Sequence, residues 1–316
     1  MEKSSKPLPH HLNDFLDWLD IEKGLSSKTQ ENYGRFLKQF LFWLKENNLE
    51  NIKPHEFTSE QVWDYRVYLS RQYLSKTKKP LKRTTQNYYL IALRALLGYF
   101  VAKDIVSLPP DKITLSKGEK ERTVKFLTLE QLSKLFSVID IANPKGLRDR
   151  AIFETFFSTG MRISELVSLE RDQIRLNPET TDLELSILGK GSKFRTVYIS
   201  EQAIKWLKKY LETRNDKEKS LFINFRSKKD TPKRLTPRAI EKIIKHYSIK
   251  AGLPIGTTPH VLRHSFATDL LNQGVDLRSV QEFLGHKNIL ATQIYTHVTN
   301  KRLRDIHRKY HGGKNL

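Results

Sequence analysis

The chain of 316 residues contains no cysteine and only two methionines. Without cysteine there can be no disulfide bond, no thiolate metal site and no cysteine nucleophile. The sequence also lacks any apolar run of about 18 residues, the length that a membrane-spanning helix needs. Its first residues, from Met1 to Pro7, do not form the apolar segment of a secretory signal peptide. These absences predict a cytoplasmic protein with no membrane partner.

What the chain has in excess is positive charge. It contains 56 lysines and arginines against 35 acidic residues, which gives a formal net charge of +21 at pH 7. Such an imbalance favours a polyanionic partner, most simply a nucleic acid. The basic residues are spread along the whole chain, whereas attachment to a membrane surface would require one basic amphipathic helix. A merely basic surface is the simpler alternative at this point.

The length suits two domains of roughly 100–200 residues each. In the first third, apolar residues recur at helical spacing in four segments, and no strand pattern interrupts them. We predict a four-helix domain over residues 9–106. Residues 107–125 contain two consecutive prolines and a charged run without apolar periodicity, which is typical of a linker. The second domain is expected over residues 126–316, with a tail helix at about 300–311.

The second domain is predicted to be mixed but mostly helical, with one small antiparallel hairpin. Apolar and polar residues alternate over 183–188 and again over 195–199, and glycines 189 and 191 mark a turn between these two strands. Lys190 is therefore expected near the tip of the hairpin. The predicted fold class is mainly α with two domains.

The stretch from Thr258 to Thr268 is the most informative part of the sequence. Thr258 is a favourable N-cap, and a proline follows it at the first helical position. His260 and Arg263 then lie three residues apart on one face of the helix. Free backbone N–H groups and the positive end of the helix dipole favour an anion at such a place. Taken alone, His260 is explained more simply as a residue that caps or packs locally.

Two other segments present groups of the same kind. Asp276 predicts the start of a short helix and Gly285 its left-handed end, so that His286 leaves the core at a fixed point. Arg162 precedes Glu165 by three residues at the start of another helix, and an ion pair between them would fix the rotamer of the arginine. As an ordinary surface salt bridge, that pair would contribute at most about 1 kcal/mol.

Tyr295 is one of 12 tyrosines, so only its combination with these groups singles it out. Two arginines can neutralise the non-bridging oxygens of a phosphate. A lysine can protonate a departing alkoxide, and a histidine can accept the proton of a tyrosine whose free pKa is about 10. Together they form a complete set for phosphoryl transfer, and their fixed positive charge means that neither a metal nor another cofactor is required.

Five stretches of the chain resemble, in order, the tyrosine recombinases of the phage integrase superfamily, and most closely the bacterial Xer recombinases that resolve chromosome dimers. These stretches are residues 159–166, 189–193, 259–268, 284–286 and 292–298. Residues 25–33 and 83–96 are similar to the two DNA-facing helices of the family's core-binding domain. The resemblance covers nearly the whole chain and implies a SAM-like core-binding domain followed by a catalytic domain.

The resemblance also implies a role for each matched residue. Tyr295 would attack the scissile phosphate and form a 3′-phosphotyrosyl link, which releases a 5′-hydroxyl. Arg162 and Arg263 would clamp that phosphate, and Glu165 would orient Arg162.

The remaining implied roles concern protons and hydrogen bonds. His286 would donate a hydrogen bond to a non-bridging oxygen, and His260 would be the leading candidate for the general base. Lys190 would protonate the leaving 5′ oxygen, with Lys193 in the same turn as the alternative.

For partners, the resemblance implies double-stranded DNA at a specific recombination site and a homo-tetrameric synaptic complex, located at the nucleoid. The tail helix of each subunit would dock on its neighbour. An accessory DNA translocase and a second recombinase stay open as partners. Basic residues should set affinity and its salt dependence, while a few side chains in the major groove should read the sequence. The candidates for DNA contact are Lys28, Thr29, Arg83, Gln86, Asn87 and Arg238.

Other functions compete with chromosome dimer resolution. An integrase or resolvase of a mobile element would use the same chemistry. An architectural DNA-binding protein would explain the charge and the helices but not the five ordered motifs. A type IB topoisomerase would share the tyrosine nucleophile, and the helical first domain and the tail argue only weakly against it. A metal-dependent nuclease or transposase would need clustered carboxylates, which the sequence does not show.

Overall fold

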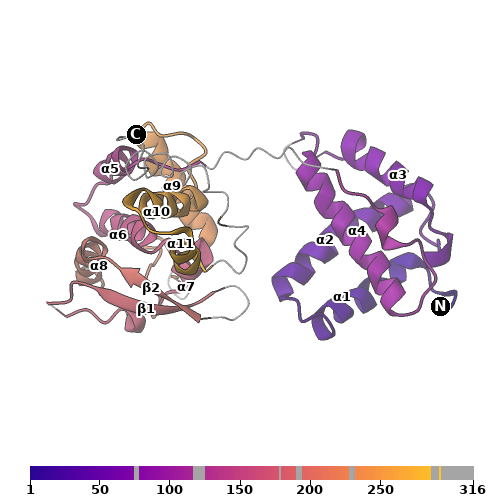
Figure 1. Ribbon diagram of the computed structural model, residues 1–316, viewed down its shortest axis with the longest axis horizontal. Coiled ribbons are helices and arrows are strands. Elements are labelled where there is room, and N and C mark those ends of the chain that lie inside the picture. The colour runs from indigo at the N-terminus through magenta and orange to yellow at the C-terminus, as the bar shows by residue number, and fades with distance from the viewer. Residues whose placement is uncertain are drawn as a thin grey trace, which may run out of the picture. The chain divides into compact units, whose positions relative to one another are not determined.

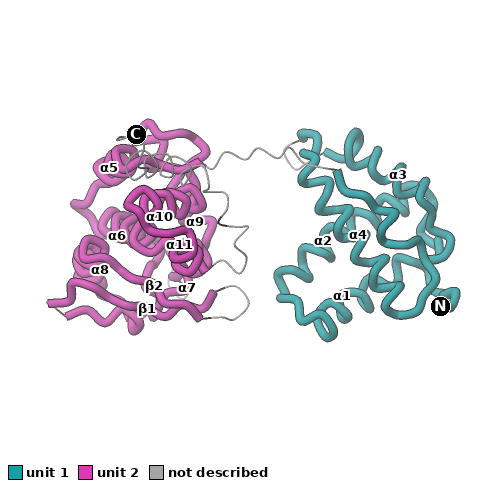
Figure 2. The backbone as a smooth tube through the Cα atoms, in the orientation of Figure 1, with its two compact units in different colours: residues 1–121 teal, residues 122–316 magenta. Residues whose placement is uncertain are grey.

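The computed structural model describes residues 1–74, 78–116, 125–177, 179–189, 194–227, 231, 233–285 and 292. Figure 1 shows the elements, and Figure 2 shows the two compact units into which the chain divides, Met1–Glu121 and Arg122–Leu316. The described part is mostly helical with one two-stranded sheet, which confirms the predicted fold class. None of its helices is both long enough and apolar enough to span a membrane.

Four α-helices form the described part of the first unit. They are α1 (Leu12–Ile21), α2 (Ser27–Glu46), α3 (Ser59–Val67) and α4 (Arg83–Ala102). A π-helical turn continues α3 over Tyr68–Gln72, and short 3-10 turns occupy Leu8–His11, Pro54–Glu56 and Pro110–Lys112. The start of α3 is fixed by a capping box, in which Thr58 Oγ1 accepts from Gln61 N at 3.4 Å and Thr58 N donates to Gln61 Oε1 at 2.9 Å.

Aromatic side chains make the centre of this unit. Phe15, Phe40, Tyr65 and Phe100 are among its largest fully buried residues. The rings of Phe40 and Tyr65 meet edge to face, with 5.0 Å between their centroids. Truncating a buried aromatic side chain to alanine typically costs about 3–5 kcal/mol, so a few such residues suffice to hold a small bundle together.

Residues 107–116 belong to this first unit, although the sequence predicted a linker from residue 107 onward. Ile113 is fully buried in the aromatic core. Asn87 in α4 donates its Nδ2 to the backbone oxygen of Ser116 at 2.9 Å, and Ser116 N donates to Asn87 Oδ1 at 3.2 Å. The prolines prevent an α-helix here, but a short 3-10 turn with irregular backbone around it can still pack against a core. Residues 117–124, the charged part of the predicted linker, lie outside the described residues.

The second unit is arranged around α6, which packs between α8 and α10 (Figure 1). Its helices are α5 (Leu129–Ser137), α6 (Pro144–Thr159), α7 (Ile163–Ser168), α8 (Glu201–Glu212), α9 (Pro237–Lys250), α10 (Pro259–Gln273) and α11 (Leu277–Leu284), with a 3-10 turn at Arg171–Gln173. The second capping box is present at Thr128, which starts α5. Because α6 is surrounded on several sides, polar side chains as well as apolar ones are buried along it.

The predicted hairpin is confirmed as strands β1 (Leu183–Leu188) and β2 (Phe194–Ile199). They pair antiparallel, with Leu183 opposite Ile199 and Leu188 opposite Phe194. The end of α6 is tied to β2, because Ser158 Oγ donates to Tyr198 O at 3.2 Å. The hairpin is therefore fixed to the central helix, while its turn residues 190–193 lie outside the described part.

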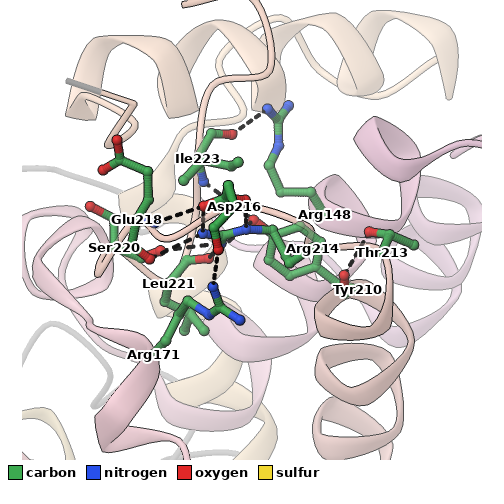
Figure 3. A network of polar contacts seen from close by, with 10 residues as sticks. All are labelled: Arg148, Arg171, Tyr210, Thr213, Arg214, Asp216, Glu218, Ser220, Leu221 and Ile223. Atoms are coloured by element: carbon green, nitrogen blue, oxygen red, sulfur yellow. Dashed lines mark hydrogen bonds and ion pairs between the residues drawn. The ribbon is translucent and has the colours of Figure 1, made fainter. Parts of the chain in front are cut away.

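A polar network fastens the loop after α8 to the end of α7 (Figure 3). The side chain of Arg214 is fully buried, and its Nε and Nη2 donate to the two carboxylate oxygens of Asp216 at 2.5 and 2.7 Å. Arg171, just beyond α7, donates its Nη1 to the backbone oxygen of Asp216 at 2.8 Å. Leu221 N also donates to Leu169 O at 2.9 Å. These bonds fix the C-terminal end of α7, the helix whose N-terminal end carries Arg162.

Candidate active site

Arg162 is the N-cap residue of α7 and follows closely after Gly160, a left-handed residue that ends α6. Its backbone N donates to Glu165 Oε2 at 2.7 Å, as a glutamate three residues into a helix often allows. Its Nη1 donates to Glu165 Oε1 at 3.0 Å, so the predicted ion pair is present. This is no ordinary surface salt bridge, because the Glu165 side chain is only 4% exposed. The rotamer of Arg162 is fixed by a buried carboxylate.

Glu165 has a second partner, which sequence reasoning missed. Arg195 in β2 donates Nη1 to Oε1 at 2.8 Å and Nη2 to Oε2 at 2.9 Å, the bidentate geometry that binds carboxylates most strongly. Burial alone would raise the pKa of Glu165, but the hydrogen bonds from Arg195 and Arg162 outweigh it and hold that pKa below its ordinary value. The carboxylate therefore stays ionised between two guanidinium groups.

One sequence signal could have identified Arg195. It lies on the same face of β2 as Val197 and Ile199, the two buried residues of that strand. An arginine on an inward strand face must be paired, because a buried unpaired charge is very unfavourable. The partner itself could not be read from the strand, since Glu165 lies on a different element.

Helix α10 begins as predicted. Thr258 Oγ1 accepts from Val261 N at 3.4 Å, with a proline at the first helical position. His260 is exposed near this start, whereas Arg263 is buried. Arg263 donates Nη1 to the backbone oxygen of Gly160 at 2.7 Å, and so ties α10 to the end of α6.

Helix α11 also begins and ends where the sequence predicts. Asp276 Oδ1 accepts from Arg278 N at 2.9 Å and from Ser279 N at 3.0 Å. Gly285 ends the helix with φ 61° and ψ 47°, in the left-handed region. The last carbonyl groups of any α-helix lack partners within the helix, so those of α11 are available to other donors.

Three arginines from three different elements bind three consecutive carbonyl groups at the end of α11. The pairs are Arg195 Nε with Phe283 O at 3.2 Å, Arg263 Nη2 with Leu284 O at 2.5 Å, and Arg162 Nη2 with Gly285 O at 3.3 Å. The negative end of the helix dipole and the carboxylate of Glu165 together offset the repulsion between the guanidinium groups. We call these three side chains the arginine cluster. The three carbonyl groups that bind it directly precede His286 in the sequence.

A further histidine, His264, lies beside the cluster on α10. Burial, together with the positive charges of His260 and Arg263, lowers the pKa of His264 to about 4. The imidazole is therefore neutral at pH 7 and adds no charge to the site.

Three of the predicted catalytic residues, Lys190, His286 and Tyr295, lie outside the described residues, and so does Lys193, the predicted alternative to Lys190. The predicted tail helix at 300–311 lies outside them as well. Of the predicted set, the structure brings together Arg162, Glu165 and Arg263, with His260 on the same helix as Arg263. Within the ranges that the structure describes, no three metal-ligating side chains form a cluster.

Three of the predicted DNA-contact residues are exposed near helix starts. They are Lys28 in α2, Arg83 in α4 and Arg238 in α9. Lys28 Nζ donates to Glu31 Oε2 at 2.6 Å, an exposed pair that is easily exchanged for another partner.

The other three candidates are engaged in local hydrogen bonds. Thr29 Oγ1 lies 3.0 Å from Ser26 Oγ, and Gln86 Nε2 donates to Leu81 O at 2.9 Å. Asn87 uses both the nitrogen and the oxygen of its side-chain amide in hydrogen bonds to the backbone of Ser116. These bonds hold the start of α2 and α4 in place.

A groove of about 1190 Å³ runs between α2 and α4. Arg35 and Lys38 line it together with the exposed aromatic residues Phe42 and Tyr88. Basic side chains interleaved with aromatic rings are typical of a surface that binds nucleic acid. Sequence reasoning missed Arg35 and Lys38, although Arg35 lies two helical turns after Lys28 and thus on the same face of α2.

Known protein families match the sequence of both units. The model of the phage integrase family matches residues 125–302, and that of the phage integrase N-terminal SAM-like domain matches residues 12–104. The chain is 36% identical over 305 residues to the tyrosine recombinase XerD of Lacticaseibacillus casei, covering 94% of this chain and 97% of the relative. It is 35% identical over 303 residues to XerC of Bacillus pumilus (strain SAFR-032), covering 94% of each.

Solved structures share the fold. The XerH site-specific recombinase bound to difH substrate matches with a TM-score of 0.71 at 22% identity, over 96% of this chain and 97% of that one. The Tn1549 transposon integrase in complex with a circular intermediate DNA matches with a TM-score of 0.67 at 18% identity, over 96% and 100%. The chain therefore belongs to the phage integrase family and is a tyrosine recombinase. Within that family it is similar to Xer recombinases along nearly its whole length.

Proposed function

We propose that this recombinase cuts and rejoins duplex DNA at a specific chromosomal site and thereby resolves chromosome dimers. The observation that carries the chemistry is the arginine cluster. Arg162 and Arg263 are held by protein atoms, the neighbouring carbonyl groups of Gly285 and Leu284. Positive charge that is fixed in advance stabilises a developing transition state without the cost of reorganisation.

In the proposed reaction, the hydroxyl of Tyr295 attacks the scissile phosphorus, and His260 accepts its proton. The bond from phosphorus to the 5′ oxygen breaks, and Lys190 supplies the proton to that oxygen, with Lys193 as the alternative donor. Arg162 and Arg263 neutralise the non-bridging oxygens, and His286 donates a hydrogen bond to one of them. The phosphotyrosyl ester conserves the bond energy, so that a second 5′-hydroxyl can reverse the step on a new strand.

DNA binding is proposed for both units. Lys28, Arg83 and Arg238 are exposed, and the groove between α2 and α4 carries Arg35 and Lys38 beside aromatic rings. These residues would contact phosphates and base edges, so that affinity falls steeply with salt.

The proposed assembly is a tetramer on two DNA sites at the nucleoid, in which each tail helix docks on a neighbouring subunit. An accessory DNA translocase and a second recombinase remain candidate partners. The full-length similarity to XerD and XerC supports the chromosomal role. Removing the gene from its host should then give filamentous cells with unpartitioned chromosomes, whereas an integrase of a mobile element would leave division unchanged.

The cutting chemistry is tested with a nicked duplex that carries the target site, recovered first from host DNA bound to the protein. In EDTA, the wild type should form a covalent protein–DNA adduct on a denaturing gel. Tyr295→Phe should lose the adduct and keep DNA binding, while Tyr198→Phe, at an exposed tyrosine of β2, should keep both. An adduct that survives Tyr295→Phe or requires magnesium would overturn the proposal.

A second measurement separates recombination from topoisomerase activity. Two target sites on one plasmid should be exchanged, and the product is detected as a change in restriction pattern. Relaxation of supercoils without exchange would instead identify a topoisomerase.

A further inference from the structure

We propose that Arg195 is a positioning residue of the cleavage reaction, which acts through Glu165 on Arg162. The inference rests on the proposed function, because cleavage is the reaction that it concerns. Arg195 in β2 and Arg162 at the start of α7 bind the same buried carboxylate.

The two arginines differ in what their guanidinium groups are free to do. The side chain of Arg195 is 11% exposed, and all three of its nitrogens have protein partners, namely both oxygens of Glu165 and the backbone oxygen of Phe283. The side chain of Arg162 is 26% exposed and touches only one oxygen of that carboxylate through its guanidinium. Arg195 is therefore the anchor of the group, and Arg162 is the side chain whose partly exposed guanidinium is left to face a phosphate.

Removing Arg195 would change the geometry of Arg162. Glu165 would lose its bidentate partner in a site where a carboxylate needs several donors to stay ionised. Arg162 is the nearest remaining cation, so the carboxylate would draw its guanidinium into a bidentate pair and away from Gly285 O. A displacement of about 1 Å in a reacting group can slow an enzyme by about 10²-fold.

Arg195 also ties the hairpin to the end of α11. Besides its bond to Phe283 O, its side chain lies against Gly285, where an added Cβ would come within 2.6 Å of Arg195 Cδ. One side chain thus fixes the positions of β2, α7 and the end of α11 relative to one another.

The first test compares cleavage with binding. In single turnovers on the nicked duplex at saturating protein, Arg195→Gln should form the adduct about 10²-fold more slowly than the wild type. Its affinity for the duplex should be unchanged, because Arg195 donates to protein atoms. Arg278→Gln is the matched control, since it removes an arginine–glutamate pair whose arginine side chain is 74% exposed. That control should cleave at the wild-type rate.

The second test asks whether the effect passes through Arg162. In an Arg162→Ala background, Arg195→Gln should slow cleavage little further, because the side chain that it positions is already gone. A scissile methylphosphonate lacks one charged oxygen, so the penalty of Arg195→Gln should also shrink on that substrate. Equal losses in both backgrounds and on both substrates would overturn the proposal.

Loss of folding is separated from loss of positioning by a neutral pair. Arg195→Gln leaves Glu165 with fewer partners and is expected to lower the melting temperature. The double variant Glu165→Gln with Arg195→Gln removes the buried charge and should recover that temperature but not the cleavage rate. Recovery of both would mean that Arg195 only stabilises the fold. If the wild type forms no adduct, the proposed function fails; if Arg195→Gln cleaves like the wild type, only this inference fails.

Discussion

The interiors of the two units differ in kind. In the first unit the buried side chains are apolar and often aromatic, and His11 is the one buried polar residue among those described. In the second unit, Arg148, Asp149, Arg214 and Arg263 are all buried. Burying ions stabilises a fold less than burying apolar groups does, and breaking one such pair costs about 3–5 kcal/mol. The buried ion pairs of the second unit hold arginines at fixed positions. The proposed role of the first unit, DNA binding, needs only side chains on its surface.

The largest expected effect comes from the charged interior. Arg263→Lys keeps the charge but cannot bridge Gly160 O and Leu284 O with two parallel donors. Losing a preorganised donor of this type slows an enzyme by about 10²–10³-fold, and we expect such a loss in the single-turnover cleavage rate. Arg83→Lys in the first unit is the control and should leave that rate unchanged. Equal rates for the two variants would remove the contrast between the units.

A smaller effect is expected at the end of α11. Gly285→Ala would place a Cβ 2.6 Å from Arg195 Cδ, at a residue whose φ is +61°. Gly252 has a φ of +65° and open space around it, so Gly252→Ala carries the backbone strain of about 1–3 kcal/mol without the clash. We expect both variants to lose stability in urea, and only Gly285→Ala to cleave more slowly, by about 10-fold or 1.4 kcal/mol. Similar cleavage by both would show that the glycine matters for the backbone alone.

Substitutions on the first unit should change affinity and not chemistry. Arg83→Ala should weaken binding and reduce the slope of log affinity against log salt by about 1, because one phosphate contact is lost. Lys103 caps the opposite end of α4 and pairs with Glu22, so Lys103→Ala should leave the slope unchanged. The measurement is a salt titration of binding, repeated at saturation for the cleavage rate. A slower rate for Arg83→Ala at saturation would contradict the division between the units.

The effect that is smallest at pH 7 concerns the pH dependence of stability. The folded-state pKa of His264 is about 4, while an unfolded histidine has a pKa of about 6.5. Between these values the unfolded chain binds a proton that the folded chain excludes, so the free energy of unfolding falls as pH drops from about 6.5 toward 4. His264→Gln should make this dependence shallower in urea denaturation. The lowered pKa of Glu165 acts at lower pH, where its stabilisation is lost as pH falls through its folded value.

What could be predicted from the sequence was decided mainly by distance along the chain. Thr258 and Asp276 were predicted as caps because a cap depends on residues a few positions away. Gly285 was predicted as a helix end for the same reason. The hairpin followed from alternation within two short strands.

The parts that sequence reasoning missed depend on distant partners. Arg195 lies 30 residues from Glu165 and 88 from Phe283, and no local spacing relates them. Ile113 packs into the first core from a segment that has no helical or strand pattern. Hydrophobic periodicity identifies the buried faces of helices and strands. It cannot identify an arginine that binds distant carbonyl groups or an irregular segment that packs against a core.

The end of α11 also bears on the synthesis of the protein. Residues 283–285, whose carbonyl groups gather the arginines, follow all three arginines in the chain. A ribosome therefore exposes the guanidinium groups before it makes the helix end that overcomes their mutual repulsion, while the first unit has already emerged. An unfinished polypeptide can carry a folded first unit but no assembled cutting site.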